Sequence, residues 1–94
     1  MSTTSVQAND PWQLWKNLRW AGLQQFSKEN YEAARMSFER ARIEARRNKP
    51  GCKNEVRSIC DLAQVFDAEG KNQKSEDYCR QAFKLTSDGA LIIH

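Results

Sequence analysis

The stretch that decides the fold is "KENYEAARMSFERARIEA", residues 28–45. Tyr31, Ala34, Phe38, Ala41 and Ala45 recur at steps of three or four, which brings their side chains to one face of an α-helix. Charged side chains fill most of the other positions. Small residues let neighbouring helix axes approach to about 8–10 Å. The pattern therefore predicts an amphipathic helix that packs closely against other helices.

A helix is also expected before this stretch. Asp10 is a suitable N-cap, and Pro11 suits the first helical position, where no backbone N–H is needed. The helix is predicted to end near Ser27. The turn that follows, at Glu29 and Asn30, is so short that the two helices must lie antiparallel.

Two more helices are predicted after the break at "NKPGCKN", residues 48–54. The third covers residues 54–69, with Asn54 as N-cap and Gly70 as a left-handed stop. The fourth covers residues 73–85 and is expected to end at the serine, aspartate and glycine of 87–89. The apolar face of the third helix comprises Val56, Ile59, Leu62, Ala63 and Phe66. The inward positions of the fourth are Ser75, Cys79, Ala82 and either Phe83 or Leu85.

The two halves look like one helical hairpin used twice. Superposing Gly22 on Ala63 sets an offset of 41 residues. At that offset, small or apolar residues largely coincide: Leu18 with Ile59, Ala21 with Leu62, Ala34 with Ser75, Phe38 with Cys79, and Ala41 with Ala82.

These motifs resemble the tetratricopeptide repeat family, whose signature is W-x₂-L-G-x₂-Y, then A-x₃-F, then a proline, in about 34 residues. The first unit matches it through Leu18, Ala21, Gly22 and Tyr31, and through Ala34, Phe38 and Ala41 in "AARMSFERA". The second unit matches through Ile59, Leu62, Ala63, Phe66, Gly70, Ser75 and Ala82. Gln25, Asn72 and Cys79 depart from the aromatic positions of the signature, Pro50 comes late, and the offset is longer than the usual period.

The resemblance implies an all-α fold, with two antiparallel helix hairpins stacked as a short right-handed α-solenoid. We expect one domain over residues 10–89, with repeats at about 12–48 and 54–87. Residues 1–9 are polar without a period and are expected to form a disordered tail. Residues 90–94, "ALIIH", form an apolar C-terminal tail.

In proteins similar to this family, the first helix of each pair lines a concave groove that holds a peptide. The resemblance therefore implies a non-enzymatic adaptor that binds a peptide or protein segment. Cations in the groove would favour acidic residues or a C-terminal carboxylate, although the same charges also fit a plain solvated face. The candidate groove residues are Lys16, Arg19, Trp20, Leu23 and Phe26 in the first unit, and Arg57, Asp61 and Gln64 in the second.

Self-association is the alternative function, because two repeats are fewer than the three or so that stable arrays need. Trp12 and Trp15 are candidates to cover an open edge or to join a second chain. Leu91, Ile92 and Ile93 either fold back over the last helix pair or contact another chain. A homo-oligomer is therefore a second hypothesis.

A third, less favoured hypothesis is nucleic-acid binding through the basic run "RARIEARRNKPGCK", residues 40–53. The chain has 15 basic and 12 acidic residues, a mild net charge of +3. Glu39 with Arg42, and Glu44 with Arg47, are spaced to neutralise each other on a helix. No aromatic residue interrupts the run to stack on a base.

Catalysis, cofactors and metals are not expected. His94 is the single histidine, which excludes a Ser-His-Asp set inside the fold, and no glycine-rich phosphate loop has the required spacing. Cys52, Cys60 and Cys79 lack zinc-ligand spacing. We expect reduced thiols, with Cys60 and Cys79 buried as small apolar residues. The sequence has neither a signal peptide nor a membrane-length apolar run, so a cytoplasmic protein is expected.

Overall fold

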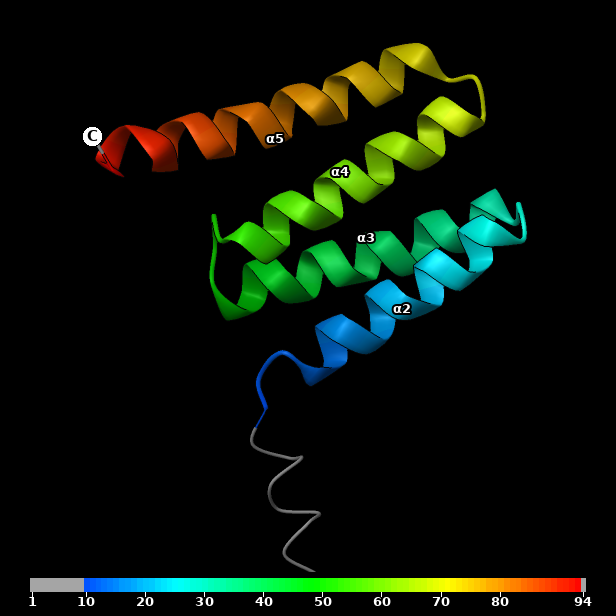
Figure 1. The fold of residues 1–94 in the computed structure, drawn as a ribbon, viewed down its shortest axis with the longest axis horizontal. Helices are drawn as coiled ribbons and strands as arrows, with labels where there is room; N and C mark the ends of the chain where they lie inside the picture. Colours follow the sequence, from blue (N-terminus) through cyan, green and yellow to red (C-terminus); the bar gives the residue numbers. More distant parts are fainter. Residues whose placement is uncertain (1–9, 94) are drawn as a thin grey trace, which may run out of the picture.

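The computed structural model describes residues 10–93, and side chains through residue 86. This part of the chain is all-helical, without a strand: α2 is Gln13–Ser27, α3 Tyr31–Asn48, α4 Lys53–Ala68 and α5 Asn72–Ile93. Each helix packs against the next one in the sequence (Figure 1). The result is a flat array of 49 × 41 × 16 Å. The all-α prediction with four helices is confirmed.

The two hairpin turns repeat each other at the offset found in the sequence. Glu29 and Gly70, 41 residues apart, have φ angles of +61° and +80°. The N–H of Asn30 donates to the Gln25 carbonyl at 2.9 Å, and that of Lys71 donates to the Phe66 carbonyl at 2.8 Å. These bonds satisfy carbonyls at the end of each first helix. The left-handed stop predicted at Gly70 is confirmed.

Both predicted helix starts are displaced. Helix α2 begins at Gln13 with Trp12 as its N-cap, so the predictions of Asp10 as N-cap and Pro11 as the first helical residue are wrong. Asp10 instead accepts the Trp12 N–H on Oδ1 at 2.8 Å in the turn before the helix. The Asn54 cap is wrong, because α4 begins at Lys53. The first turn of α4 is instead tied by the buried Glu55 carboxylate, which accepts the Gly51 N–H at 2.7 Å.

The predicted end of the last helix at 87–89 is also wrong, since α5 continues to Ile93. Serine, aspartate and glycine each cost only about 0.5–1 kcal/mol in a helix, and no proline follows them. The predicted tail over 90–93 is therefore helical in its backbone. The side chains of Leu91, Ile92 and Ile93, together with residues 1–9 and 94, lie outside what the structure describes.

The core lies where the small residues predicted it. Phe38 and the alanines of the α3 face are buried, as are Gly22 and Ala63. A Cβ placed on Gly22 would lie 2.5 Å from Cε1 of Phe38, so only glycine fits beside this ring. In the second unit Ala63 and Cys79 stand at these two positions. The first unit thus pairs the smallest residue, glycine, with a large ring, whereas the second unit pairs a slightly larger alanine with a smaller cysteine.

The inward face of α5 differs from the prediction. Tyr78, which was not predicted, stacks on Phe66 with ring centroids 5.4 Å apart. Cys60 and Cys79 are exposed instead of buried, and Phe83 is 72% exposed. The Tyr78 ring covers the end of α4 by stacking on Phe66. The surface of α4 and α5 that carries Cys60 and Cys79 is not covered by another helix of the described residues, so both thiols are exposed.

Candidate interaction groove

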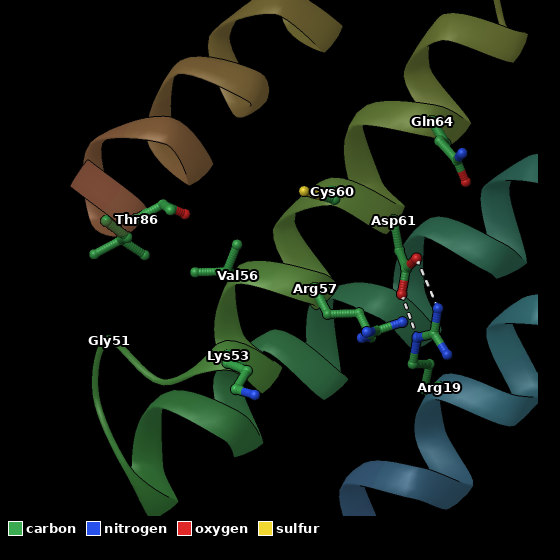
Figure 2. A pocket seen from close by; sticks show the side chains of 10 residues that line it. Arg19, Gly51, Lys53, Val56, Arg57, Cys60, Asp61, Gln64 and Thr86 are labelled. Carbon is green, nitrogen blue, oxygen red and sulfur yellow. Dashed lines mark hydrogen bonds and ion pairs between the residues drawn. The ribbon is translucent and has the colours of Figure 1, made fainter. Parts of the chain in front are cut away.

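A groove of about 670 Å³ runs along α4, open to solvent on one side (Figure 2). Most of its lining comes from one face of α4, because side chains three and four residues apart align on a helix. Arg19 of α2 closes one edge, and the C-terminal half of α5 closes the other. Its principal lining residues are Val56, Arg57, Cys60, Gln64, Leu85 and Thr86.

An ion pair holds the α2 edge of the groove. Nε of Arg19 lies 2.7 Å from Oδ2 of Asp61, and Nη2 lies 3.3 Å from Oδ1. The Asp61 side chain is only 8% exposed. Both residues were groove candidates, but each neutralises the charge of the other. Arg19 thus fastens α2 to α4 and presents little free charge to a ligand.

A second bond between the hairpins lies one turn away, in the core. The indole N–H of Trp15 donates to Oγ of Ser58 at 2.8 Å, and Trp15 is 8% exposed. Trp12, half-buried, meets Trp15 edge to face with centroids 6.1 Å apart. Trp15 is therefore a core residue of the single chain, which removes it from the surfaces open to a second chain. Ser58 was missed, and its only signal was its place between apolar positions of the α4 pattern.

The groove carries free positive charge. Lys53 and Arg57 are exposed and form no ion pair within the described residues. With Arg19 neutralised by Asp61, they leave two uncompensated cations along one wall. Val56 and Leu85 add apolar surface beside them. The arrangement suits a ligand that combines carboxylates with an apolar group.

Cys60 lies between the charged and apolar parts of the groove. Partial burial, with the nearby Cys79 and Asp61, raises the pKa of the Cys60 thiol, while Arg57 opposes the shift. The thiol is therefore protonated near neutral pH and is a weak nucleophile. Cys60 contributes surface to the groove, and its chemistry is not that of a catalytic thiolate.

The remaining groove candidates lie elsewhere. Lys16 pairs with Asp10 at 3.1 Å. Lys16, Trp20 and Leu23 line a separate depression of about 150 Å³ on α2. Phe26 packs against the core and against Tyr31, with centroids 5.6 Å apart. The structure thus gathers Arg19, Arg57, Asp61 and Gln64 in one groove, and places the other four outside it.

Three of the six cations in the basic run of residues 40–53 form ion pairs. Arg42 pairs with Glu39 as its spacing predicted. Arg47 lies 3.7 Å from Glu44, and Arg46 lies 3.4 Å from the buried Glu55. A phosphate would compete with these carboxylates for Arg42, Arg46 and Arg47.

Comparison with known proteins gives no relative: no protein-family model, curated sequence or solved structure matches this chain significantly. Over residues 10–93, no helix has the length and apolarity to cross a membrane. The same residues contain no group of three or more side chains arranged to hold a metal ion.

Proposed function

We propose that this chain is a non-enzymatic interaction module that binds an acidic peptide or protein segment in the α4 groove. Its architecture is proposed to be a short right-handed, tetratricopeptide-like α-solenoid of two hairpins. The repeated turns at Glu29 and Gly70, and the match of Gly22 with Phe38, support this arrangement. The function rests on one observation: among the residues whose side chains the structure describes, Lys53 and Arg57 form no ion pair, and they lie beside the apolar side chains of the groove.

The bound segment would place carboxylates on Lys53 and Arg57 and an apolar side chain between Val56 and Leu85. Charge-assisted hydrogen bonds to exposed cations add modest affinity, while the buried apolar side chain supplies most of it. Gln64 can donate or accept a hydrogen bond from the segment's backbone. This combination selects acidic amphipathic segments over basic ones.

Fluorescence anisotropy tests the proposal with a labelled peptide of alternating glutamate and leucine. The peptide should bind, and a lysine–leucine peptide should not. Replacing Lys53 and Arg57 together by alanine should weaken binding about tenfold, as expected for two exposed ion pairs. Lys28→Ala combined with Arg40→Ala removes the same two charges, one lysine and one arginine, from exposed positions outside the groove and serves as the control. Equal binding of both peptides, or no effect of the double substitution, would contradict the proposal.

A further inference from the structure

The contact between the two hairpins provides a template for a second contact of the same kind. Helix α4 meets the first hairpin through a stripe on one of its faces. Ser58 bonds Trp15, and Asp61 bonds Arg19. Leu62 and Val65 join Ala34 and Phe38 in one buried cluster.

The offset of 41 residues gives the positions equivalent to this interface at both ends of the array. Adding 41 to each of six residue numbers of the first hairpin gives a set on α4 and α5, which we call the receiving face. The six starting residues are Trp15, Arg19, Ala34, Phe38, Ala41 and Ala45. The six residues of the receiving face are Val56, Cys60, Ser75, Cys79, Ala82 and Thr86. Cys60, Cys79 and Thr86 of this face are exposed. Val56 and Ser75 are half-buried, and Ala82 is 5% exposed.

The residues of α4 that contact the first hairpin are Ser58, Asp61, Leu62 and Val65. Subtracting 41 from each of these numbers gives four residues of α2, which we call the α2 stripe. Its centre is Trp20, which is 63% exposed and occupies the position of Asp61. The α2 stripe comprises Asn17, Trp20, Ala21 and Gln24.

The two surfaces are chemically complementary. In the internal contact Asp61 meets Arg19; at the equivalent positions Trp20 would meet Cys60, so both charges are replaced together. Neither the receiving face nor the α2 stripe contains a charged residue, in a chain where 29% of residues are charged. The receiving face overlaps the 670 Å³ groove at Val56, Cys60 and Thr86, which leaves room for an indole. Exposed tryptophan is a favoured anchor of protein interfaces.

We propose that α2 of a second copy docks on the receiving face as α4 docks on the first hairpin, with Trp20 seated against Cys60. Helices α2 and α5 lie at opposite ends of the array (Figure 1). Copies therefore join head to tail and each added copy leaves a new receiving face open. The assembly extends as short linear oligomers.

This inference goes beyond the peptide-binding function and is independent of it. Lys53 and Arg57 lie outside both surfaces, while Trp20 lies outside the groove. Substituting Lys53 and Arg57 should weaken peptide binding and leave assembly unchanged. Trp20→Glu should weaken assembly and leave peptide binding unchanged when binding is measured at protein concentrations too low for assembly. Because Val56 and Cys60 are shared, a bound peptide and a docked copy exclude each other at that end.

Sedimentation velocity over a range of concentrations tests the association. The average mass of the native chain should rise with concentration. Trp20→Glu should weaken association at least about 30-fold, the loss expected for a tryptophan hot spot. Met36→Glu is the matched control, since it adds the same charge at an exposed apolar residue of α3. A native chain that stays monomeric, or equal effects of the two substitutions, would overturn the proposal.

Disulfide trapping tests the geometry. Gln24→Cys, which leaves Trp20 in place, is introduced with Cys52→Ser and Cys60→Ser, so Cys79 is the remaining native thiol. The pair is chosen because Val65 and Phe38, the equivalent residues of the internal contact, share one buried cluster. Oxidised glutathione should then produce a non-reducing ladder of dimers, trimers and larger species, with linkage between the Q24C sulfur and Cys79 read by peptide mass mapping. A product that stops at a dimer would indicate a closed two-fold contact and would overturn the head-to-tail arrangement.

Discussion

The contact between Gly22 and Phe38 predicts a strong energetic coupling. Ala at position 22 would place its Cβ 2.5, 2.6 and 2.9 Å from three ring carbons of Phe38, all closer than packed carbons approach. Such overpacking costs about 1–3 kcal/mol. The better helix propensity of alanine returns about 1 kcal/mol. Gly22→Ala should therefore lower the free energy of unfolding by about 0–2 kcal/mol.

Replacing the ring removes the conflict. In a Phe38→Leu background, Gly22→Ala should be neutral or stabilise by up to about 1 kcal/mol, because only the propensity gain remains. The propensity gain cancels in the double-mutant cycle, which should thus give a coupling energy equal to the overpacking cost, about 1–3 kcal/mol. Urea unfolding followed by circular dichroism measures each corner of the cycle, with the slope m checked for constancy.

The second unit supplies the control. Ala63 occupies the position equivalent to Gly22, with Cys79 in place of the ring. Ala63→Gly should destabilise by about 1 kcal/mol through helix propensity. Alanine would then be more stabilising than glycine at position 63 and less stabilising than glycine at position 22. If Gly22→Ala had the same effect with Phe38 and with leucine at that position, the close-approach argument would be refuted.

Three further predictions concern the bonds, turns and thiols. Ser58→Ala should cost about 1–3 kcal/mol in urea unfolding, because the Trp15 indole N–H is left buried without an acceptor; an unchanged midpoint would contradict this. Gly70→Ala should destabilise by about 1 kcal/mol and Glu29→Gly should stabilise by a smaller amount, since both positions have positive φ; opposite signs in thermal melts would contradict it. Because packing raises the pKa of Cys60, its thiolate forms at higher pH in the folded than in the unfolded chain. Stability from this thiol is present below the unfolded pKa of about 8.5 and is lost as pH rises; in iodoacetamide alkylation, coincident pH onsets for folded and unfolded Cys60 would contradict it.

The helices and their pairing could be predicted because they depend on local signals. The spacing of Ala34, Phe38 and Ala41 fixes one buried face, and Gly70 requires a turn there. The offset between the two units also follows from sequence and is repeated in the backbone turns. The end of α5 could not be predicted, since weak helix formers stop a helix only when the context favours another conformation.

The groove was only partly predictable, because it depends on which charges find partners. Sequence placed Arg19 and Arg57 on the same surface, but could not show that Asp61 neutralises the first and leaves the second free. That distinction depends on the rotation of α2 relative to α4, which is a tertiary property. Likewise, the periodic pattern of α5 did not reveal that Tyr78 would stack on Phe66 and leave Cys79 exposed.

The central claim is that Lys53 and Arg57 of α4, which form no ion pair with any side chain described through residue 86, mark the surface at which this module binds its ligand. Amide chemical-shift mapping tests it most directly, using the glutamate–leucine peptide and the Trp20→Glu variant to keep the protein monomeric. The account predicts that shifts concentrate at residues 53–64 and around Thr86, and saturate with the anisotropy curve. Shifts concentrated on the basic face of α3, or no saturable shifts on α4, would contradict it.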